Sequence, residues 1–358
     1  MTDYTFEGWC GHDSSSAKGN MKWEEYTPKT WSENDVDIKI SHCGVCGSDL
    51  HTLRSGWYPT PYPCVVGHEI IGKAVRVGSN VTHVKVGDRV GVGAMAQSCG
   101  KPDCPGCSEG SENHCASAVG TYGAAFLDGT GKTYGGYANY NRTPGHFVFQ
   151  IPDAIESEHA APMMCGGITV YNPLVTWGAK GKRVGIVGLG GLGHFGVLFA
   201  KALGAAEVVV ISRTHAKEED AKKLGADRFI ATVDEGWDQG ENASSLDLIV
   251  STVSSDKIPL SGYLSLLKLR GTFVQVGAPE DPLPAVPAFT LIMKAVRITG
   301  SGVGSTQQIR DMLQFVVEKG IKPWTQEILL KDANKAVVAF EDGKPRYRLV
   351  LKNENYTD

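Results

Sequence analysis

The chain has 358 residues, 42% of them apolar, and a formal net charge of −4 at neutral pH. This length suffices for about two domains, each with its own core. The slight negative charge, with no basic run longer than two residues, argues against a protein that grips nucleic acid through its phosphates.

The first 154 residues are rich in Gly, Pro, Thr and Val and contain only short apolar runs, for example at 36–40, 70–77 and 88–92. This texture predicts an irregular, β-rich domain. The N-terminus has no positive segment followed by an apolar stretch, which is the form of a secretory signal. We therefore expect a cytoplasmic protein, in which thiols stay reduced.

Between about residues 155 and 300, short apolar strands alternate with helical stretches, as in βαβ units with a parallel sheet. Strands are predicted at 183–188, 207–212, 228–231, 247–252, 272–276 and 295–300. Helices are predicted at about 191–203, 215–224 and 258–268. No membrane span is predicted, because the most apolar segment carries His, Lys, Glu and several glycines. After residue 300 we expect a helix at 305–319 and a strand at 346–351 that returns to the first domain.

The first of these strands runs directly into a glycine-rich turn and a helix. The turn reads Gly188-Leu189-Gly190-Gly191-Leu192-Gly193, which is the dinucleotide-binding spacing in its strand–turn–helix context. Gly188 permits the tight turn, Gly190 lets the backbone approach the pyrophosphate, and Gly193 lets the helix pack on the strand. The alternative is that the glycines only punctuate an apolar segment. The context favours a Rossmann, doubly wound parallel sheet over 155–300.

The second strand ends at Ser212-Arg213-Thr214, where an NAD enzyme usually places an acid for the ribose hydroxyls. No acid stands here. Ser212, Arg213 and Lys217 could instead bond to a 2′-phosphate and neutralise it. The sequence therefore predicts NADP(H), the alternative being that the two cations are only solvated residues at a helix start.

Nine cysteines in a reducing compartment are thiols or metal ligands rather than disulfides. Cys46, His68 and Cys165 have the composition of a catalytic zinc site, which needs three protein ligands and one open position. Spacing alone does not join ligands so far apart. Cys43 and Cys46 also form a CxxC pair, so a redox role is an alternative.

A second group of four cysteines lies within 17 residues, in a loop rich in Gly, Pro, Ser and Glu: Cys99, Cys104, Cys107 and Cys115. Four thiolates around one ion form a closed tetrahedral site, which predicts a structural zinc. The metal would order a loop that has little apolar surface of its own. Disulfides are the alternative; a zinc-finger module is not favoured, because the basic helix it needs is absent.

Together, these motifs resemble the zinc-containing medium-chain alcohol dehydrogenases, in particular the cinnamyl alcohol dehydrogenase branch of the fungal NADP-dependent type. The resemblance covers nearly the whole chain and rests on the segments 43–46, 67–72, 86–93, 135–138, 160–162, 165–171, 184–193, 211–213 and 346–348. It implies a GroES-like catalytic domain over 1–154, to which 301–358 return, and a Rossmann domain over 155–300. It also implies a homodimer formed by joining two Rossmann sheets.

Carried over position by position, the resemblance makes Cys46, His68 and Cys165 the catalytic zinc ligands, with Glu69 as a ligand that exchanges with water. Asp49 would orient His68, and Ser48 with His51 would form the proton relay. The residues that fall where the family contacts NADP are Ser48, Thr169, Thr252, Gly277, Ser301, Gly302, Val303 and Arg348. For Arg348, the alternative is a charge on a surface strand.

One feature departs from the family. Its structural-zinc loop usually has two residues between the first two cysteines, and here four residues separate Cys99 from Cys104. We expect the ion to bind still, because a loop with Gly and Pro can bulge, but the role of Cys99 is open.

The predicted function is a zinc-dependent transfer of hydride between NADP(H) and a primary alcohol/aldehyde pair, with aryl or medium-to-long aliphatic aldehydes reduced. The rivals are a zinc-independent alkene or quinone reductase, a non-catalytic NADP-binding protein, and a polyol or secondary-alcohol enzyme. Trp57, Tyr58, Met95 and Tyr122 are candidates for an apolar pocket wall, with core packing as the alternative.

Overall fold

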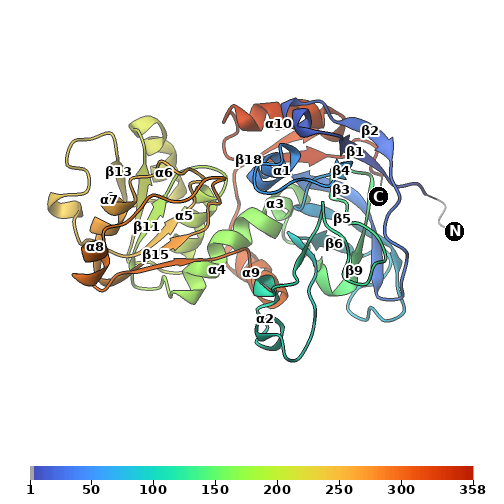
Figure 1. Ribbon diagram of the computed structural model, residues 1–358, viewed down its shortest axis with the longest axis horizontal. Helices are drawn as coiled ribbons and strands as arrows, with labels where there is room; N and C mark the ends of the chain where they lie inside the picture. Colours follow the sequence, from blue (N-terminus) through green and yellow to red (C-terminus); the bar gives the residue numbers. More distant parts are fainter. Residues whose placement is uncertain (1–3, 358) are drawn as a thin grey trace. The chain divides into compact units, whose positions relative to one another are not determined.

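The computed structural model describes residues 4–357, which divide into two compact units (Figure 1). One unit combines the chain up to Cys165 with the segment from Gly304 onward, and the other spans Gly166–Val303. The expected boundaries at 154/155 and 300/301 lie slightly before these positions. Helix α3 (Ser157–Pro162) accounts for the first difference, because it packs on strands of the first unit. No helix among residues 4–357 is both long and apolar enough to cross a membrane.

The first unit is built on a seven-stranded, mostly antiparallel sheet, as its β-rich texture predicts. The strands are, in order, β10 (Val148–Gln150), β6 (Arg89–Val92), β5 (Ile70–Val77), β3 (Asp35–Gly44), β18 (Arg348–Lys352) and β17 (Thr325–Leu329), with β9 (Tyr140–Pro144) also paired to β3. Strand β18 pairs with β3, so the C-terminal segment lies in the first unit. Because β3 is antiparallel to both β5 and β18, its C-terminal end lies beside the starts of those two strands.

Smaller elements complete this unit. Three strands form a second sheet, in the order β2 (Lys22–Glu25), β1 (Glu7–Gly11) and β4 (Cys64–Val65), and β7 (Met95–Gln97) pairs with β8 (Val119–Gly120). The helices are α1 (Gly47–Leu53), α2 (Pro105–Ser108), α3, α9 (Thr306–Lys319) and α10 (Ala333–Glu341). The predicted helix at 305–319 is confirmed as α9. Ser305 forms a capping box with Gln308, and Gly320 ends the helix with a φ of 62°.

The second unit has a six-stranded parallel sheet in the order expected for a doubly wound fold. Its strands are β13 (Arg228–Ala231), β12 (Glu207–Ser212), β11 (Arg183–Val187), β14 (Leu246–Ser251), β15 (Leu267–Gln275) and β16 (Arg297–Gly300). All six predicted strands are confirmed. One boundary was wrong: β15 starts at Leu267, because this residue pairs with Leu246 before an irregularity in the ladder, and the preceding helix is correspondingly shorter.

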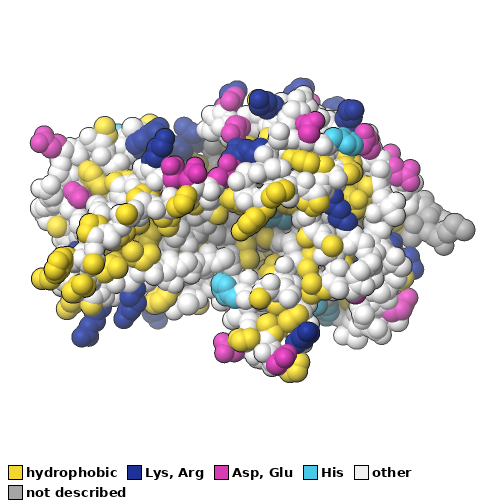
Figure 2. Space-filling model, viewed as in Figure 1, with side chains coloured by type: hydrophobic (Ala, Val, Ile, Leu, Met, Phe, Trp, Pro, Cys, Tyr) yellow, Lys and Arg dark blue, Asp and Glu magenta, His cyan; other side chains and the backbone are white. Residues whose placement is uncertain are grey.

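The helices of the second unit are α4 (Ile168–Thr176), α5 (Gly193–Ala202), α6 (Glu218–Leu224), α7 (Leu260–Ser265) and α8 (Ala288–Ile292). Helix α5 packs on α4, β11 and β12, so the segment after the glycine turn is anchored on the sheet. The short helix α8 was not predicted from the sequence. Figure 2 shows apolar side chains gathered around it, and Phe289, Ile292 and Met293 are exposed there.

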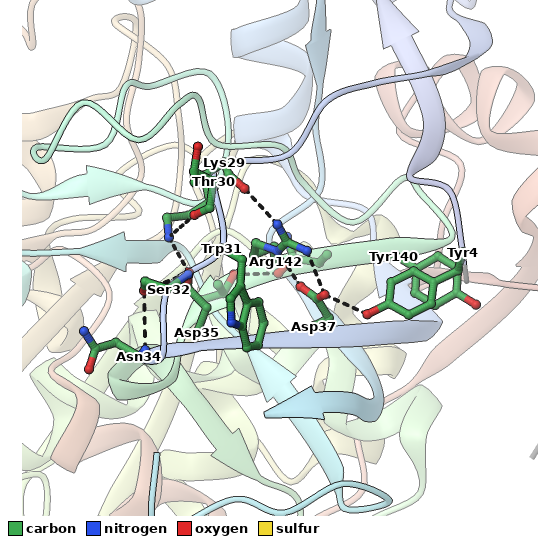
Figure 3. A network of polar contacts seen from close by, with 12 residues as sticks. Tyr4, Lys29, Thr30, Trp31, Ser32, Asn34, Asp35, Asp37, Tyr140 and Arg142 are labelled. Atoms are coloured by element: carbon green, nitrogen blue, oxygen red, sulfur yellow. Dashed lines mark hydrogen bonds and ion pairs between the residues drawn. The ribbon is translucent and has the colours of Figure 1, made fainter. Parts of the chain in front are cut away.

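A network of charged side chains fixes β9 on β3 (Figure 3). Arg142 of β9 and Asp37 of β3 are register partners, and the guanidinium donates to both carboxylate oxygens at 2.7 and 2.9 Å. Tyr4 donates to the same carboxylate at 2.7 Å. Nearby, the buried Lys29 ammonium pairs with Asp35. A register shift would separate these partners and leave buried charges uncompensated, so the network specifies one pairing.

Candidate active site and metal centres

Four side chains of the first unit converge in a buried cluster: Cys46, His68, Glu69 and Cys165. Each offers one ligand atom, and these atoms all lie within 4.8 Å of one another. Cys46 precedes α1, while His68 and Glu69 directly precede β5. Cys165 lies in the π-helical turn η4 (Met163–Gly167), which follows α3. The fold therefore brings together the ligands that sequence spacing could not join.

His68 shows which of its ring nitrogens faces this cluster. Its Nδ1 lies 3.2 Å from Asp49 Oδ1 and 3.0 Å from the Tyr122 hydroxyl oxygen. Its Nε2 is buried and has no hydrogen-bond partner among the described residues. Buried polar atoms are normally hydrogen-bonded, and the ligand sulfurs of two cysteines belong to the same cluster as His68. A metal ion bound at Nε2 would be the missing partner of this nitrogen, so the residues fit a metal of the zinc type.

The pKa values of the two cysteine thiols in the cluster shift in opposite directions. A hydrogen bond with Cys165, and the charge of the nearby His68 ring, lower the pKa of the Cys46 thiol well below its usual range despite burial. The same hydrogen bond raises the pKa of Cys165. Since the thiolate is the form that binds a metal, the site already favours the ionised ligand at Cys46.

Glu69 is held by a partner that the sequence did not predict. The buried Arg348 guanidinium forms an ion pair with both carboxylate oxygens, although Arg348 was expected to approach the cofactor. Burial raises the pKa of Glu69 to about 7, and the charge of Arg348 opposes this rise. Gly44 leaves room for the carboxylate, because a Cβ there would lie 1.9 Å from Glu69 Oε2.

Helix α1 carries the expected relay residues. Ser48 Oγ lies 3.8 Å from Cys46 Sγ. His51 is three residues further along, and residues at this spacing lie on one face of a helix. The His51 ring stacks on Trp57, with a centroid distance of 4.5 Å and an interplanar angle of 17°. Asp49, between them, accepts from the Cys46 backbone N–H at 2.9 Å and so ties the helix start to the cluster.

A pocket of about 140 Å³ opens beside these residues. It is lined by His51, Thr52, Trp57, Tyr58, Pro59, Thr60, Pro61, Tyr122 and Gly123. Of the four candidates for a pocket wall, Trp57, Tyr58 and Tyr122 line it and Met95 does not. Met95 lies instead in β7, where it pairs with Gly120.

The second cysteine group also closes into a cluster, with ligand atoms within 4.8 Å of one another. Cys99 Sγ lies 3.7 Å from Cys107 Sγ and 3.5 Å from Cys115 Sγ, and Cys104 Sγ lies 3.8 Å from Cys115 Sγ. The unusual spacing is absorbed by a turn in which Gly100 has a φ of 60°. Cys99 therefore joins the other three, and the cluster fits a tetrahedral structural zinc.

In the second unit, the glycine turn has the geometry that its motif predicts. Gly188 has a φ of 86°, and a Cβ at Gly193 would lie 1.8 Å from the Gly188 carbonyl oxygen. A Cβ at Gly190 would meet nothing within 4 Å, so the backbone there faces open space. The N-terminus of α5 follows this turn directly, and a strand, glycine turn and helix start in this order form the usual binding site of a pyrophosphate.

The residues expected at the 2′-phosphate gather next to this turn. Ser212 ends β12, Arg213 is exposed directly after it, and Lys217 Nζ donates to the Leu189 carbonyl at 2.7 Å. Lys217 thus places its charge against the glycine turn. The other expected contacts Thr252, Gly277 and Ser301–Val303 follow β14, β15 and β16 at the same sheet edge, whereas Thr169 is buried in α4.

Comparison with known proteins identifies the family. The models of the alcohol dehydrogenase GroES-like domain and of the zinc-binding dehydrogenases match residues 32–153 and 191–318. NADP-dependent alcohol dehydrogenase 6 of Saccharomyces cerevisiae is 44% identical over 93% of this chain and 92% of its own. Cinnamyl alcohol dehydrogenase 2 of Arabidopsis thaliana is 40% identical over 97% of this chain and 91% of its own. The chain belongs to the zinc-binding alcohol dehydrogenases.

Solved structures agree with this membership. A cinnamyl alcohol dehydrogenase of Sorghum bicolor superposes with a TM-score of 0.92 at 36% identity, covering 99% of this chain and 100% of its own. Another from Helicobacter pylori, complexed with NADP(H), gives 0.89 at 32% identity, with 99% of each chain covered. The predicted fold, with a GroES-like and a Rossmann domain, is confirmed. So is the enzyme class, a zinc-dependent oxidoreductase of alcohols and aldehydes. The predicted NADP(H) agrees with the Helicobacter pylori complex and with the name of the Saccharomyces cerevisiae relative.

Two contacts in the site of this dehydrogenase were not predicted from the sequence. Nothing in the spacing of residue 348 indicated that its guanidinium would meet Glu69, although its place in a strand returning to the first domain was a usable signal. Nothing indicated that Tyr122, a pocket candidate, would also meet His68. Both contacts depend on three-dimensional packing of segments far apart in the chain.

Proposed function

We propose that this dehydrogenase uses NADP(H) to interconvert primary alcohols and aldehydes, and that it mainly reduces aryl or medium-to-long aliphatic aldehydes. The observation that carries the proposal is the convergence of Cys46, His68 and Cys165, in which the buried His68 Nε2 has no hydrogen-bond partner among the described residues. A zinc-independent reductase or a cofactor sensor has no use for such a set.

Zinc held by Cys46, His68 and Cys165, with Glu69 as the exchangeable ligand, would supply a Lewis acid for the substrate oxygen. The chain's own groups then do the remaining work. The Ser48 hydroxyl can donate a proton to the substrate oxygen once hydride has reached the carbonyl carbon, which completes the alcohol, and can then accept another proton, because a hydroxyl is both donor and acceptor. His51 would return that proton from solvent through the cofactor ribose, since the two nitrogens of an imidazole can accept and donate a proton.

The choice of substrate is supported by the pocket beside His51. Its walls include the aromatic rings of Trp57, Tyr58 and Tyr122, which offer flat apolar surface to an aryl or extended aliphatic chain. Relatives that match nearly the whole chain are named for cinnamyl alcohols and for 8-hydroxygeraniol, both alcohols with large unsaturated groups. One relative is a probable mannitol dehydrogenase, so polyols belong among the tested substrates.

The NADP preference is supported by the end of β12. Ser212 occupies the place of the expected acid, and Arg213 and Lys217 bring two positive charges to the adjoining loop. A 2′-phosphate would gain charge-assisted hydrogen bonds there, whereas NAD(H) would leave the cations unused. The glycine turn from Gly188 to Gly193 would hold the pyrophosphate for either cofactor.

We also propose a homodimer joined through the Rossmann sheets. Strand β16 is the last strand of the six-stranded sheet, so its outer backbone N–H and C=O groups could pair with a strand of a second chain. Ile298 on this strand is exposed, and so are the apolar side chains around α8 in Figure 2. A cytoplasmic location is the other proposal, supported by nine cysteines of which none forms a disulfide in the described structure.

The test follows the consumption of NADPH and NADH with cinnamaldehyde, a small aliphatic aldehyde, and a polyol in the oxidising direction. Wild-type protein is expected to reduce cinnamaldehyde with NADPH, and Cys46→Ser is expected to lose both the activity and one of two zinc ions. Cys10→Ser changes a buried cysteine outside both clusters and should keep both.

Two results would contradict the proposal. Equal turnover by wild type and Cys46→Ser would favour a zinc-independent reductase. NADPH binding without reduction of any aldehyde would favour a cofactor sensor.

A further inference from the structure

Tyr122 contributes both to the wall of the pocket and to the surroundings of the metal-ligand cluster. It follows strand β8, and its ring lines the pocket that also contains His51 and Trp57. The neighbouring Thr121 anchors the segment, because its buried hydroxyl donates to the Gly93 carbonyl at 2.5 Å. The segment that carries the ring is therefore anchored by a contact that does not depend on a bound substrate.

The hydroxyl of Tyr122 points away from solvent toward the ligand set. Its oxygen lies 3.0 Å from His68 Nδ1. The Tyr122 and His68 rings are tilted by 39°, with centroids 5.3 Å apart. The hydroxyl, not a stacked ring face, thus makes the directional contact.

The next question is which atom accepts the hydrogen on His68 Nδ1. An imidazole that gives its Nε2 lone pair to a metal keeps its hydrogen on Nδ1, and that hydrogen needs an acceptor. Two oxygens surround Nδ1 here, Asp49 Oδ1 at 3.2 Å and the Tyr122 oxygen at 3.0 Å. Asp49 is also occupied by the backbone N–H groups of Cys46 and Gly67 and by the Tyr137 hydroxyl. A carboxylate with so many donors holds any one of them less tightly.

We propose that Tyr122 is a positioning residue for His68: its hydroxyl shares the Nδ1 hydrogen with Asp49 and keeps Nε2 directed at the metal, while its ring forms the pocket wall. This rests on the proposed role of His68 as a zinc ligand. A consequence is that the residue that shapes the substrate site also sets the geometry of a metal ligand. Changes at position 122 then alter metal binding as well as substrate choice.

The test is Tyr122→Phe, which removes the hydroxyl and keeps the ring. The affinity of the catalytic zinc, measured in the holoenzyme by competition with a chelator, is expected to fall by about tenfold, the lower end of the effect of such outer partners. The visible spectrum of the cobalt-substituted enzyme is expected to change, because the ligand field reports the His68 orientation. We expect kcat to fall with zinc saturating, and KM for cinnamaldehyde to stay within about twofold because the ring remains.

Tyr58→Phe is the matched control, since Tyr58 lines the same pocket but is 82% exposed. It should leave zinc affinity and the cobalt spectrum unchanged. Retention of the structural zinc will show that each variant is folded. Wild-type zinc affinity and an unchanged cobalt spectrum in Tyr122→Phe would overturn the proposal, as would an effect on KM alone. Failure of Cys46→Ser to lose zinc would instead overturn the proposed function.

Discussion

Gly44 offers a sharp test of how the ligand set is assembled. A Cβ at this position would lie 1.9 Å from Glu69 Oε2 and 2.9 Å from both Cβ and Cδ of the same residue. No side chain accommodates such distances, so Gly44→Ala must push the Glu69 carboxylate away or displace β3. Because the carboxylate is paired with the buried Arg348 guanidinium, moving it breaks a buried ion pair.

Breaking one side of a buried pair costs about 3–5 kcal/mol. A domain has only about 5–15 kcal/mol of stability in total, so Gly44→Ala should remove a large part of it. The matched control is Gly47→Ala, in the same motif, where a Cβ would meet only Phe340 at 4.0 Å. Gly47 is the first residue of α1, and alanine is the better helix former there.

The free energy of unfolding in urea and the zinc content per chain measure the outcome. We expect Gly44→Ala to lose about 3 kcal/mol or more and to bind the catalytic zinc poorly, while Gly47→Ala behaves as wild type. Equal stability of the two variants would refute the reasoning, because it would mean that the Glu69 carboxylate is free to leave Arg348 at little cost.

Three further predictions follow from the charges and the second cysteine cluster. Replacing both Arg213 and Lys217 with alanine should raise KM for NADPH about tenfold or more and leave KM for NADH within about twofold; parallel changes would contradict a phosphate site. Cys104→Ser should lose the structural zinc and lower the melting temperature by about 5 °C or more, unlike Cys10→Ser. Hydrogen bonds to two carboxylates raise the pKa of His215 above 6.5, so its stabilisation is full below pH 6.5 and disappears as pH rises through the raised value. His215→Gln should abolish this pH dependence in urea unfolding; an unchanged profile would contradict it.

The sequence predicted best where the signal is local. The six strands of the second unit, the glycine turn and helix α9 each depend on periodicity, glycine geometry or a capping box within a few residues. The start of β15 was placed too late because Leu267 is apolar in a helix and in a strand alike. Only its pairing with Leu246 decides between them, and pairing is a non-local property.

The active site shows the same division between local and non-local information. The candidate ligands could be proposed from the sequence, because cysteine, histidine and glutamate stand in motifs that resemble those of the family. The contacts that support these ligands could not be predicted, because they depend on the folded chain. Arg348 contacts Glu69 because β18 pairs with β3, and Tyr122 contacts His68 because it follows β8, the strand after the structural-zinc loop. The two zinc centres are thereby connected along one segment: Cys115 ends the structural cluster, and the chain passes through β8 directly to Tyr122. A change in the structural-zinc loop should therefore lower activity by altering the orientation of His68, and it should leave cofactor binding unchanged.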